Sequence, residues 1–425
     1  FGPHDKDSTH SGDSIKWGIK RISNDELRQK FVDATVPQAK VLGVTLPDPA
    51  LRFNEERGHW DFGPIDWTEF WNVVNGHGPL NRDRLADRVQ AWEDGQRAST
   101  GRGSFEWWYF DAHFDDHTTA VIVYATKPIN NPGAPLTPNL SLTITRADGR
   151  KTAEFALPPA EQFSAAQEMC AVSIGPSCVK QTGSGTCWTF SLHAETNSLA
   201  ADLTFTGLVP PWRPGAGKSF FGDLEHYFAW LPAIPYGSVE GTLTYDGQTH
   251  AVRGNGYHDH NWGNVALSSV MDHWYWGRAH VGDYTLIFVE QIAVKKYGSI
   301  RMPVFLLACG KEHRLGEQVL VDDGRYLTLQ KGDFIRHPGG REYPREVDFI
   351  WKRDKDQVIL ELRKQELIEG VSLLPALPPV KRALARLVAN PYYFRFNTEL
   401  DLKIDVGDLH DSIRGPALYE IMMLR

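Results

Sequence analysis

The chain has 425 residues, of which 41% are hydrophobic, 23% charged and 12% aromatic. This balance is typical of a globular protein and excludes extended disorder. The formal net charge of −8 comes from 45 basic and 53 acidic residues without a long basic run, so we expect no nucleic-acid partner. No apolar stretch approaches the roughly 20 residues that a transmembrane helix needs, so we also expect no transmembrane segment.

The cysteine content favours a reducing compartment. Four cysteines are too few for a disulfide framework: Cys170, Cys178, Cys187 and Cys309. A Cys170–Cys178 or a Cys178–Cys187 disulfide stays open, but free thiols are the simpler interpretation, and we expect a cytoplasmic protein. Export after removal of a signal peptide is open as well, because the numbering starts at Phe1 rather than at a methionine.

The first hundred residues differ in pattern from the rest. Residues 1–20 are polar, and helical spacing of apolar residues follows over 24–43, 66–76 and 80–94, so we expect an N-terminal arm and helical prelude over 1–103. From residue 104 onward, short runs rich in Val, Thr, Tyr, Phe and Trp alternate with turn signals, which predicts an all-β sandwich or barrel. One late helix is expected over 378–388, ended by Asn390-Pro391.

An internal echo predicts two related β-domains. Residues 107–118 align without gaps onto residues 274–285, with Trp, Ala, His, Asp and Thr repeated at matching places. Each copy continues into an apolar strand. We therefore expect a first β-domain over 104–245 and a second, containing the late helix, over 246–425.

The densest polar and aromatic cluster lies between glycines at 254–263. In an extended chain, His258, His260 and Trp262 share one face, while Tyr257, Asp259 and Asn261 share the other. Three interpretations stay open. The two histidines could bind a metal together with a carboxylate from elsewhere, one imidazole could act in acid–base chemistry tuned by Asp259, or the cluster could be a buried structural network.

Two carboxylates on apolar strands are further candidates. Glu290 shares a strand face with Leu286, Phe288 and Ile292, so it either pairs with a cation such as Arg278 or stays protonated as a general acid.

Glu106 is the other carboxylate, and the aromatic residues that follow it could form either a core or a pocket. It shares a face with Trp108 and Phe110, while Trp107 and Tyr109 point the other way. Trp274 and Trp276 are their equivalents in the second copy. These aromatic rings could fill a barrel or wall a pocket that stabilises a cation.

Several common sites are missing from the sequence. The segment 215–219 lacks P-loop spacing, and no G-x-S-x-G nucleophile elbow is present. We therefore expect no cofactor and assign no metal ligand.

The strings Glu106-Trp107-Trp108-Tyr109 and Tyr257-His258-Asp259-His260-Asn261-Trp262 resemble the lipocalin-like carotenoid 1,2-hydratase (hydroxyneurosporene synthase) family. This family also includes fungal decalin-forming Diels–Alderases. The resemblance spans about 104–425 and implies two lipocalin-like (calycin) antiparallel β-barrel or sandwich domains, a pocket between or within them, and no organic cofactor. It places the family's functional His and Trp on His260 and Trp262, and an aromatic–x–carboxylate pair on Phe288 and Glu290. The family hydratases carry Tyr and Asp at that pair, which suggests a different substrate or the dehydrating direction.

The leading hypothesis is therefore a cofactor-independent hydratase or dehydratase acting on a small hydrophobic isoprenoid. Glu290 would transfer the proton and His260, oriented by Asp259, would handle the water. The remaining candidates would bind the substrate and shield a tertiary cation: Trp262, Phe288, Trp276, Tyr109, Trp107, Tyr257, His258 and Glu106. A cofactor-free isomerase or cyclase of a polyene and a non-catalytic carrier of hydrophobic ligands are the alternatives. The oligomeric state is left open.

Overall fold

The computed structural model describes residues 88–128, 131–221, 226–310, 318–374 and 391–425. It also describes residue 85 and four short strands before it: β1 (Gly2–Pro3), β2 (Trp17–Gly18), β3 (Arg52–Asn54) and β4 (His59–Asp61). The helices expected over 24–43, 66–76 and 378–388 lie outside the described residues. Within the segment 80–94, the described end forms a 3₁₀ helix, η2 (Ala91–Asp94).

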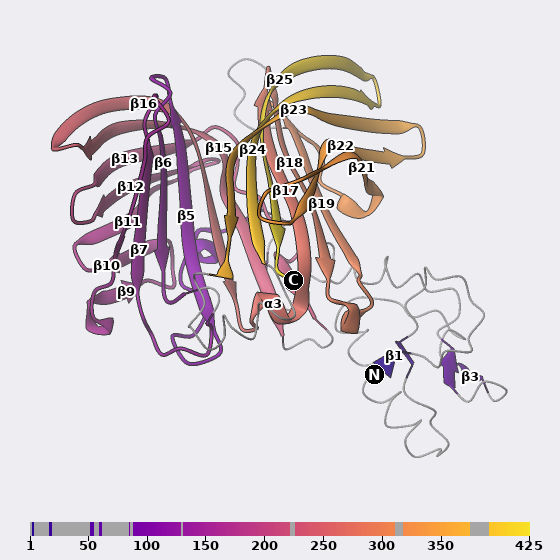
Figure 1. Ribbon diagram of the computed structural model, residues 1–425, viewed down its shortest axis with the longest axis horizontal. Helices are drawn as coiled ribbons and strands as arrows, with labels where there is room; N and C mark the ends of the chain where they lie inside the picture. Colours follow the sequence, from indigo (N-terminus) through magenta and orange to yellow (C-terminus); the bar gives the residue numbers. More distant parts are fainter. Residues whose placement is uncertain are drawn as a thin grey trace.

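The described chain is mainly β, and two antiparallel sheets lie side by side (Figure 1). The first sheet has 12 strands in the order β8-β7-β6-β5-β16-β15-β13-β12-β11-β10-β9, with β14 paired to β15. Its strands are β5 (Phe105–Phe114), β6 (Thr119–Ala125), β7 (Asn139–Thr145), β8 (Lys151–Ala156), β9 (Phe163–Ala165), β10 (Ala171–Ile174), β11 (Ser177–Ser184), β12 (Trp188–Glu195), β13 (Ala200–Gly207), β14 (Lys218–Phe220), β15 (Tyr227–Tyr245) and β16 (Gln248–Gly263). A 3₁₀ helix, η3 (Ala160–Gln162), precedes β9.

The second sheet has 9 strands in the order β20-β19-β18-β17-β25-β24-β23-β22-β21. Its strands are β17 (Met271–Val281), β18 (Tyr284–Ala293), β19 (Arg301–Cys309), β20 (Gln318–Val321), β21 (Leu327–Arg336), β22 (Glu342–Arg353), β23 (Asp356–Ser372), β24 (Tyr392–Val406) and β25 (Leu409–Met423). A short helix, α3 (Leu267–Val270), links the sheets, and the second sheet carries η4 (Lys295–Tyr297) and η5 (Gly324–Tyr326).

The two sheets share one topology. In each, the first strand lies between the second and the last: β5 between β6 and β16, and β17 between β18 and β25. Because β5 and β17 carry the two copies of the internal echo, this arrangement agrees with the predicted repeat. The lipocalin-like name for the two units stays a prediction.

The change from one sheet to the other comes later in the chain than predicted. The expected boundary at 245/246 falls in the hairpin between β15 and β16, whose residues pair from Tyr245↔Gln248 to Phe228↔Gly263. Such a long ladder holds β16 in the first sheet, so the sheets separate between Gly263 and Met271. The expected domain boundary thus lies at a hairpin turn of the first sheet.

Each sheet has one face filled by its own core. Trp108, Phe110, Tyr124 and Phe190 pack on this inner face in the first sheet, and a corresponding set packs on that of the second: Phe288, Phe349, Phe396 and Tyr419. A third cluster, which includes Tyr257, Met271 and Val289, lies where the opposite, outer faces of the two sheets meet. The inner faces of both sheets are therefore covered by their own cores and leave no obvious place for a ligand.

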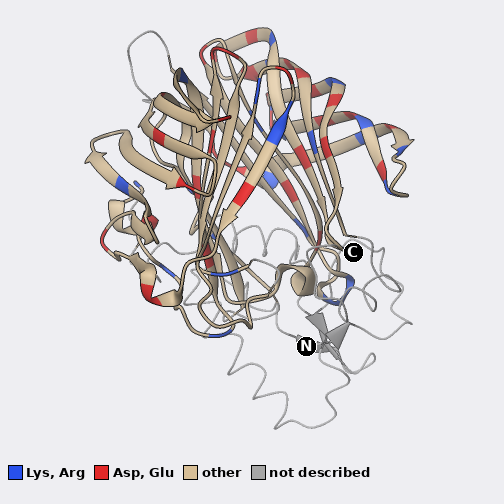
Figure 2. Ribbon diagram, turned by 60° about the vertical axis from the view of Figure 1, so that its left-hand side comes forward, with Lys and Arg blue, Asp and Glu red and all other residues tan. Residues whose placement is uncertain are grey.

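The surface charges and the cysteines do not by themselves indicate a function. Acidic and basic residues are interspersed along the strands of both sheets (Figure 2). Among the described residues, no helix combines the length and hydropathy needed to cross a membrane. The four cysteines are free, and Cys170 and Cys309 are buried.

Candidate active site between the two sheets

A cavity of about 660 Å³ lies between the outer faces of the two sheets. Its volume falls within the range of about 300–1,000 Å³ that is usual for small-molecule sites. Aromatic side chains from both sheets dominate its wall: Trp107, Tyr109, Phe228, Trp230, Tyr257, Trp274 and Trp276. Phe155 and Leu157, both 69% exposed, also line it and form an apolar rim.

Strand register builds the first wall. Side chains of alternate residues point to the same face of a sheet, and cross-strand partners lie side by side. One row runs straight across five strands: Trp230, Asn261, Trp107, Ala125 and Asn139. The next row in the same direction consists of Asp259, Tyr109 and Val123. All of these residues line the cavity.

The second wall is built in the same way from β18, β17 and β25. Gln291, Trp274 and Met422 form one row. Val289, Trp276 and Glu420 form the next, and both rows line the cavity. Trp107 and Trp274, which occupy matching positions of the echo, thus line the cavity from opposite sides, on the equivalent strands β5 and β17.

Asp259 is the best-held polar group in the cavity wall. Its Oδ2 accepts hydrogen bonds from Trp230 Nε1 and the Tyr257 hydroxyl, both at 2.8 Å. Its Oδ1 accepts one from Asn261 Nδ2 at 2.7 Å. Burial raises the pKa of Asp259 to about 6, although these hydrogen bonds oppose the shift. Oδ1 has a further lone pair that can carry a proton.

Two more polar groups of the second sheet line the cavity. Gln291 is 8% exposed, and its Oε1 is buried without a hydrogen-bond partner within the described part of the chain. Burial raises the pKa of Glu420, opposed by Arg395 and a hydrogen bond from Tyr393. The unpartnered Oε1 of Gln291 is available to accept a hydrogen bond from a water molecule or a substrate hydroxyl, since leaving a buried amide oxygen unsatisfied costs free energy.

An ion-pair network joins the two sheets beside the cavity. Arg278 pairs with Asp111, which occupies the equivalent position of the echo 167 residues earlier. Arg395 lies 3.8 Å from Asp111 and 3.5 Å from Glu420. The Arg278 guanidinium also lies 4.8 Å from the centre of the Tyr257 ring. This network connects the position of Tyr257, and through it Asp259, to the second sheet.

The two histidines of the 254–263 segment lie on the opposite face of β16 from the cavity. The His258 ring stacks on Phe110 with ring centres 3.8 Å apart, and the His260 ring stacks on Trp108 with ring centres 4.6 Å apart. His260 Nε2 lies 2.8 Å from Glu106 Oε1, and burial lowers the pKa of His260 to about 3. Burial also raises the pKa of Glu106 to about 8. The predicted alternation is therefore correct, but Asp259 does not orient His260.

Glu290 and Phe288 also lie away from the cavity, on the inner face of the second sheet. Phe288 is fully buried against Phe349, with ring centres 4.8 Å apart. Glu290 accepts a hydrogen bond from Arg301 Nε at 2.6 Å, so it pairs with a cation, as one of the two interpretations expected. The partner is Arg301 rather than Arg278. Of this strand, Val289 and Gln291 line the cavity, whereas Glu290 does not.

The structure thus brings together five of the eleven predicted site residues at the cavity: Trp107, Tyr109, Tyr257, Asp259 and Trp276. Six lie elsewhere: Glu106, His258, His260, Trp262, Phe288 and Glu290. Trp262 lines a separate hollow of about 240 Å³ with Glu93 and Arg213. The sequence did not identify Trp230, Gln291 and Glu420 as site residues, because only the register between distant strands brings them together. Strand alternation does indicate that Gln291 and Glu290 point to opposite faces of their sheet.

Comparison with known proteins divides the chain into two matched regions. Residues 1–96 match the family model described as phenylacetic acid catabolic protein. Residues 146–314, from β8 into the segment after β19, match the carotenoid hydratase CrtC model. The part called a helical prelude therefore resembles a family different from that of the β-sheets.

Curated relatives follow the same division. The chain is 56% identical over 95 residues to one of the subunits of the 1,2-phenylacetyl-CoA epoxidase of Escherichia coli, covering 22% of this chain and 31% of that protein. It is 26% identical over 206 residues to the quinolone epoxide rearrangement protein penF of Penicillium thymicola, covering 44% and 56%. It is 37% identical over 183 residues to the acyclic carotenoid 1,2-hydratase of Cereibacter sphaeroides, covering 41% and 60%. The chain spans less than two thirds of the length of each of these relatives.

Solved structures share the fold at low identity. CghA in complex with Sch210972 superimposes with a TM-score of 0.51 at 13% identity, covering 80% of this chain and 96% of CghA. A candidate AttH protein from Nitrosomonas europaea gives a TM-score of 0.52 at 12% identity, covering 79% and 97%. These likenesses concern the fold alone. The sequence resemblance is confirmed by the family match: over residues 146–314, which include the Tyr257–Trp262 string, this chain matches the carotenoid hydratase CrtC family.

Proposed function

We propose that this protein is a hydratase or dehydratase that adds or removes water at a tertiary carbon of an isoprenoid, with Asp259 as the acid. The observation that carries the proposal is a buried carboxyl group, held by three hydrogen-bond donors, in the wall of an aromatic cavity. The similarity to an acyclic carotenoid 1,2-hydratase supports the reaction class. The aromatic wall suits an acyclic terpenoid alkene, a tertiary alcohol such as a linalool-type monoterpenol, or the end group of a carotenoid.

The geometry supports a protonation mechanism. In the hydration direction, the proton on Asp259 Oδ1 adds to the less substituted alkene carbon, which leaves the positive charge on the tertiary carbon. The faces of the surrounding aromatic rings stabilise this cation by about 0.5–2 kcal/mol each. A water molecule then attacks the cation and loses its proton to the Asp259 carboxylate, which restores the acid. Dehydration follows the same steps in reverse, and no organic cofactor takes part in the proposed sequence.

The unpartnered Gln291 Oε1 is proposed to hold the attacking water. Replacing Gln291 by methionine preserves a long, unbranched side chain but removes the acceptor. We expect hydration to fall by at least about tenfold, which corresponds to the loss of one buried hydrogen bond. Isomerised or eliminated products should increase relative to alcohol, because the cation still forms but is captured less efficiently. The product ratio, measured by gas chromatography, checks this expectation.

The test of the proposed function uses the purified full chain without added cofactor. Acyclic terpene alkenes, tertiary terpene alcohols and a carotenoid precursor are incubated separately in oxygen-18 water, and the products are identified by mass spectrometry. Incorporation of one labelled oxygen into an alkene, or loss of one water from an alcohol, is the expected result. Bound but unchanged ligand would instead identify a carrier of hydrophobic molecules.

A second candidate function is a cofactor-free rearrangement or cyclisation at constant mass. The specific observation in its favour is the similarity to penF, described as a quinolone epoxide rearrangement protein. Asp259 could protonate an epoxide oxygen as readily as an alkene carbon, and the same cavity would then fold the cationic intermediate. A product of unchanged mass without labelled oxygen would favour this alternative.

A further inference from the structure

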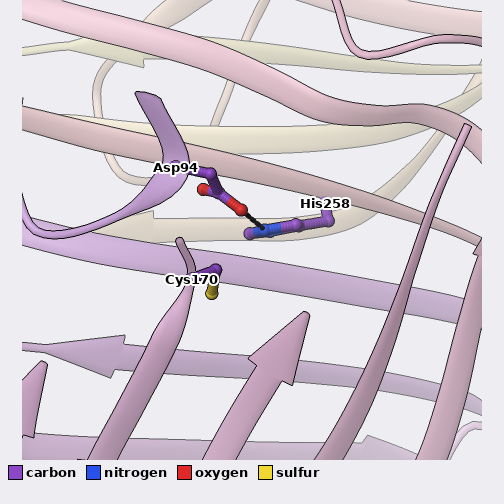
Figure 3. A group of neighbouring side chains, drawn as sticks. All are labelled: Asp94, Cys170 and His258. Carbon is purple, nitrogen blue, oxygen red and sulfur yellow. Dashed lines mark hydrogen bonds and ion pairs between the residues drawn. The ribbon is translucent and has the colours of Figure 1, made fainter. Parts of the chain in front are cut away.

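We infer that Asp94, Cys170 and His258 form a buried structural zinc site, with His260 as the fourth ligand. One ligand atom from each of the first three residues lies within 4.8 Å of the others (Figure 3). This site lies on the inner side of β16, so the inference does not depend on the proposed function. It departs from the expectation that the protein has no metal ligand, but it follows one of the interpretations that the sequence left open for the two histidines.

The hydrogen bonds of His258 leave one of its ring nitrogens facing Asp94. Its Nδ1 lies 2.9 Å from the carbonyl oxygen of Tyr109 and must donate to it, since a carbonyl can only accept. In the neutral ring, Nε2 then carries no hydrogen, yet it lies 3.1 Å from Asp94 Oδ2. A lone pair facing a carboxylate oxygen is repulsive, so either a proton or a metal ion must lie between them.

His260 repeats the same mismatch on the other carboxylate oxygen. Glu106 accepts the backbone N–H groups of Arg97 and Ala98, and in its ionised form it also accepts from His260 Nε2 at 2.8 Å. A neutral His260 ring then has no hydrogen on Nδ1, which lies 3.4 Å from Asp94 Oδ1. His260 Nδ1 and Asp94 Oδ1 are both buried without a hydrogen-bond partner in the described residues. A zinc ion between these groups would satisfy both oxygens of Asp94 and the ring nitrogens that face them.

The chemistry and charge of the ligand set fit zinc. Aspartate oxygen, cysteine sulfur and histidine nitrogen are the usual zinc donors, and four of them make a closed, structural site. Zn²⁺ with one carboxylate, one thiolate and two neutral imidazoles has no net charge, which suits side chains that are fully buried. Tetrahedral ligands at zinc distances lie about 3.3–3.8 Å apart, so the ligand atoms of Asp94, Cys170 and His258, which lie within 4.8 Å of one another, need to approach by about 1–1.5 Å at most.

Such a site would connect three distant parts of the chain. Asp94 ends η2, Cys170 directly precedes β10, and His258 lies on β16. The ion would therefore fasten the segment before the first sheet to the inner face of that sheet. A side effect would be to fix the strand that presents Asp259 on its other face.

The test compares metal content and spectra of the full chain with those of matched cysteine variants. The wild type is expressed in medium supplemented with zinc or with cobalt, alongside Cys170→Ser and Cys309→Ser. Cys309 is a second buried free cysteine, in the core of the other sheet, and serves as the control. We expect about one zinc per chain in the wild type and in Cys309→Ser, and little in Cys170→Ser. The cobalt-grown wild type should show a thiolate-to-cobalt charge-transfer band, which remains informative even if Cys170→Ser does not fold.

Thermal unfolding completes the test. A strong chelator should lower the Tm of the wild type by at least about 5 °C, since bound metal stabilises the folded state by mass action. Absence of metal, of a cobalt band and of any chelator effect would overturn the inference, and shared protons between Asp94 and the histidines would replace it. Metal that persists unchanged in Cys170→Ser would also overturn it, because the ion would then be bound elsewhere.

Discussion

Replacing Asp259 by asparagine is expected to lower kcat/KM by at least about 10²–10⁴-fold, the usual contribution of a positioned acid. Asparagine has nearly the same size but no proton to transfer. Its amide group also cannot accept from all three neighbours, because Trp230, Tyr257 and Asn261 all donate toward this position. Turnover of the substrate identified in the labelling experiment, measured with excess enzyme to capture slow rates, checks this prediction.

Glu290→Gln is the matched control for Asp259→Asn. It makes the same carboxyl-to-amide change in a buried side chain, 4% exposed, that lies on the opposite face of its strand from the cavity. It should retain activity within about threefold, provided that circular dichroism and Tm confirm folding. If Glu290→Gln lost activity while Asp259→Asn kept it, the proton would belong to Glu290, as the sequence resemblance alone suggested.

The local pattern of the site could be predicted from the sequence, because alternation in a strand is a property of the chain itself. Residues 257–262 were divided correctly between two faces, as were Trp107 and Trp108. Which of these faces meets a cavity depends instead on how the two sheets pack. The sequence contains no comparable signal for how the sheets pack, so it does not predict that Asp259 and Gln291 line the cavity while the two histidines and Glu290 do not.

The packing of the sheets also explains why the cavity is not inside a barrel. Large side chains such as Tyr124, Phe190 and Phe305 are fully buried in the cores on the two inner faces. Aromatic rings of the two outer faces line the cavity of about 660 Å³ that lies between them. A ligand can thus contact both sheets, and both copies of the internal echo contribute to its environment.

The charged contact between the sheets gives the second large expected effect. Asp111→Ala should reduce the free energy of unfolding by about 3–5 kcal/mol, because it leaves buried positive charge without its partner. Asp111 is 1% exposed and its partner Arg278 is 13% exposed, so water can replace the lost interaction only in part. Urea denaturation at pH 7 measures this change.

The choice of pH 7 follows from the pKa of Asp111. Burial alone would raise that pKa, but Arg278, His113 and Arg395, together with a hydrogen bond from Tyr109, hold it below its ordinary value. A carboxyl whose pKa is lower in the folded state stabilises the fold above its unfolded pKa, and this stabilisation is lost as the pH falls through the folded pKa. At pH 7 the contribution is fully present, and the difference between wild type and Asp111→Ala should shrink in strongly acidic solution.

The control is an exposed ion pair in the second sheet. Lys364 Nζ lies 3.0 Å from Glu399 Oε2, with side chains 75% and 39% exposed, so Glu399→Ala should change stability by less than about 1 kcal/mol. Asp111→Asn, which keeps the shape but not the charge, provides a second variant if alanine prevents folding. A loss at Asp111 no larger than that at Glu399 would show that the two sheets are held together by their aromatic contact alone. In that case the charged network would serve only to position Tyr257 beside Asp259, and its effect should be sought in kcat rather than in stability.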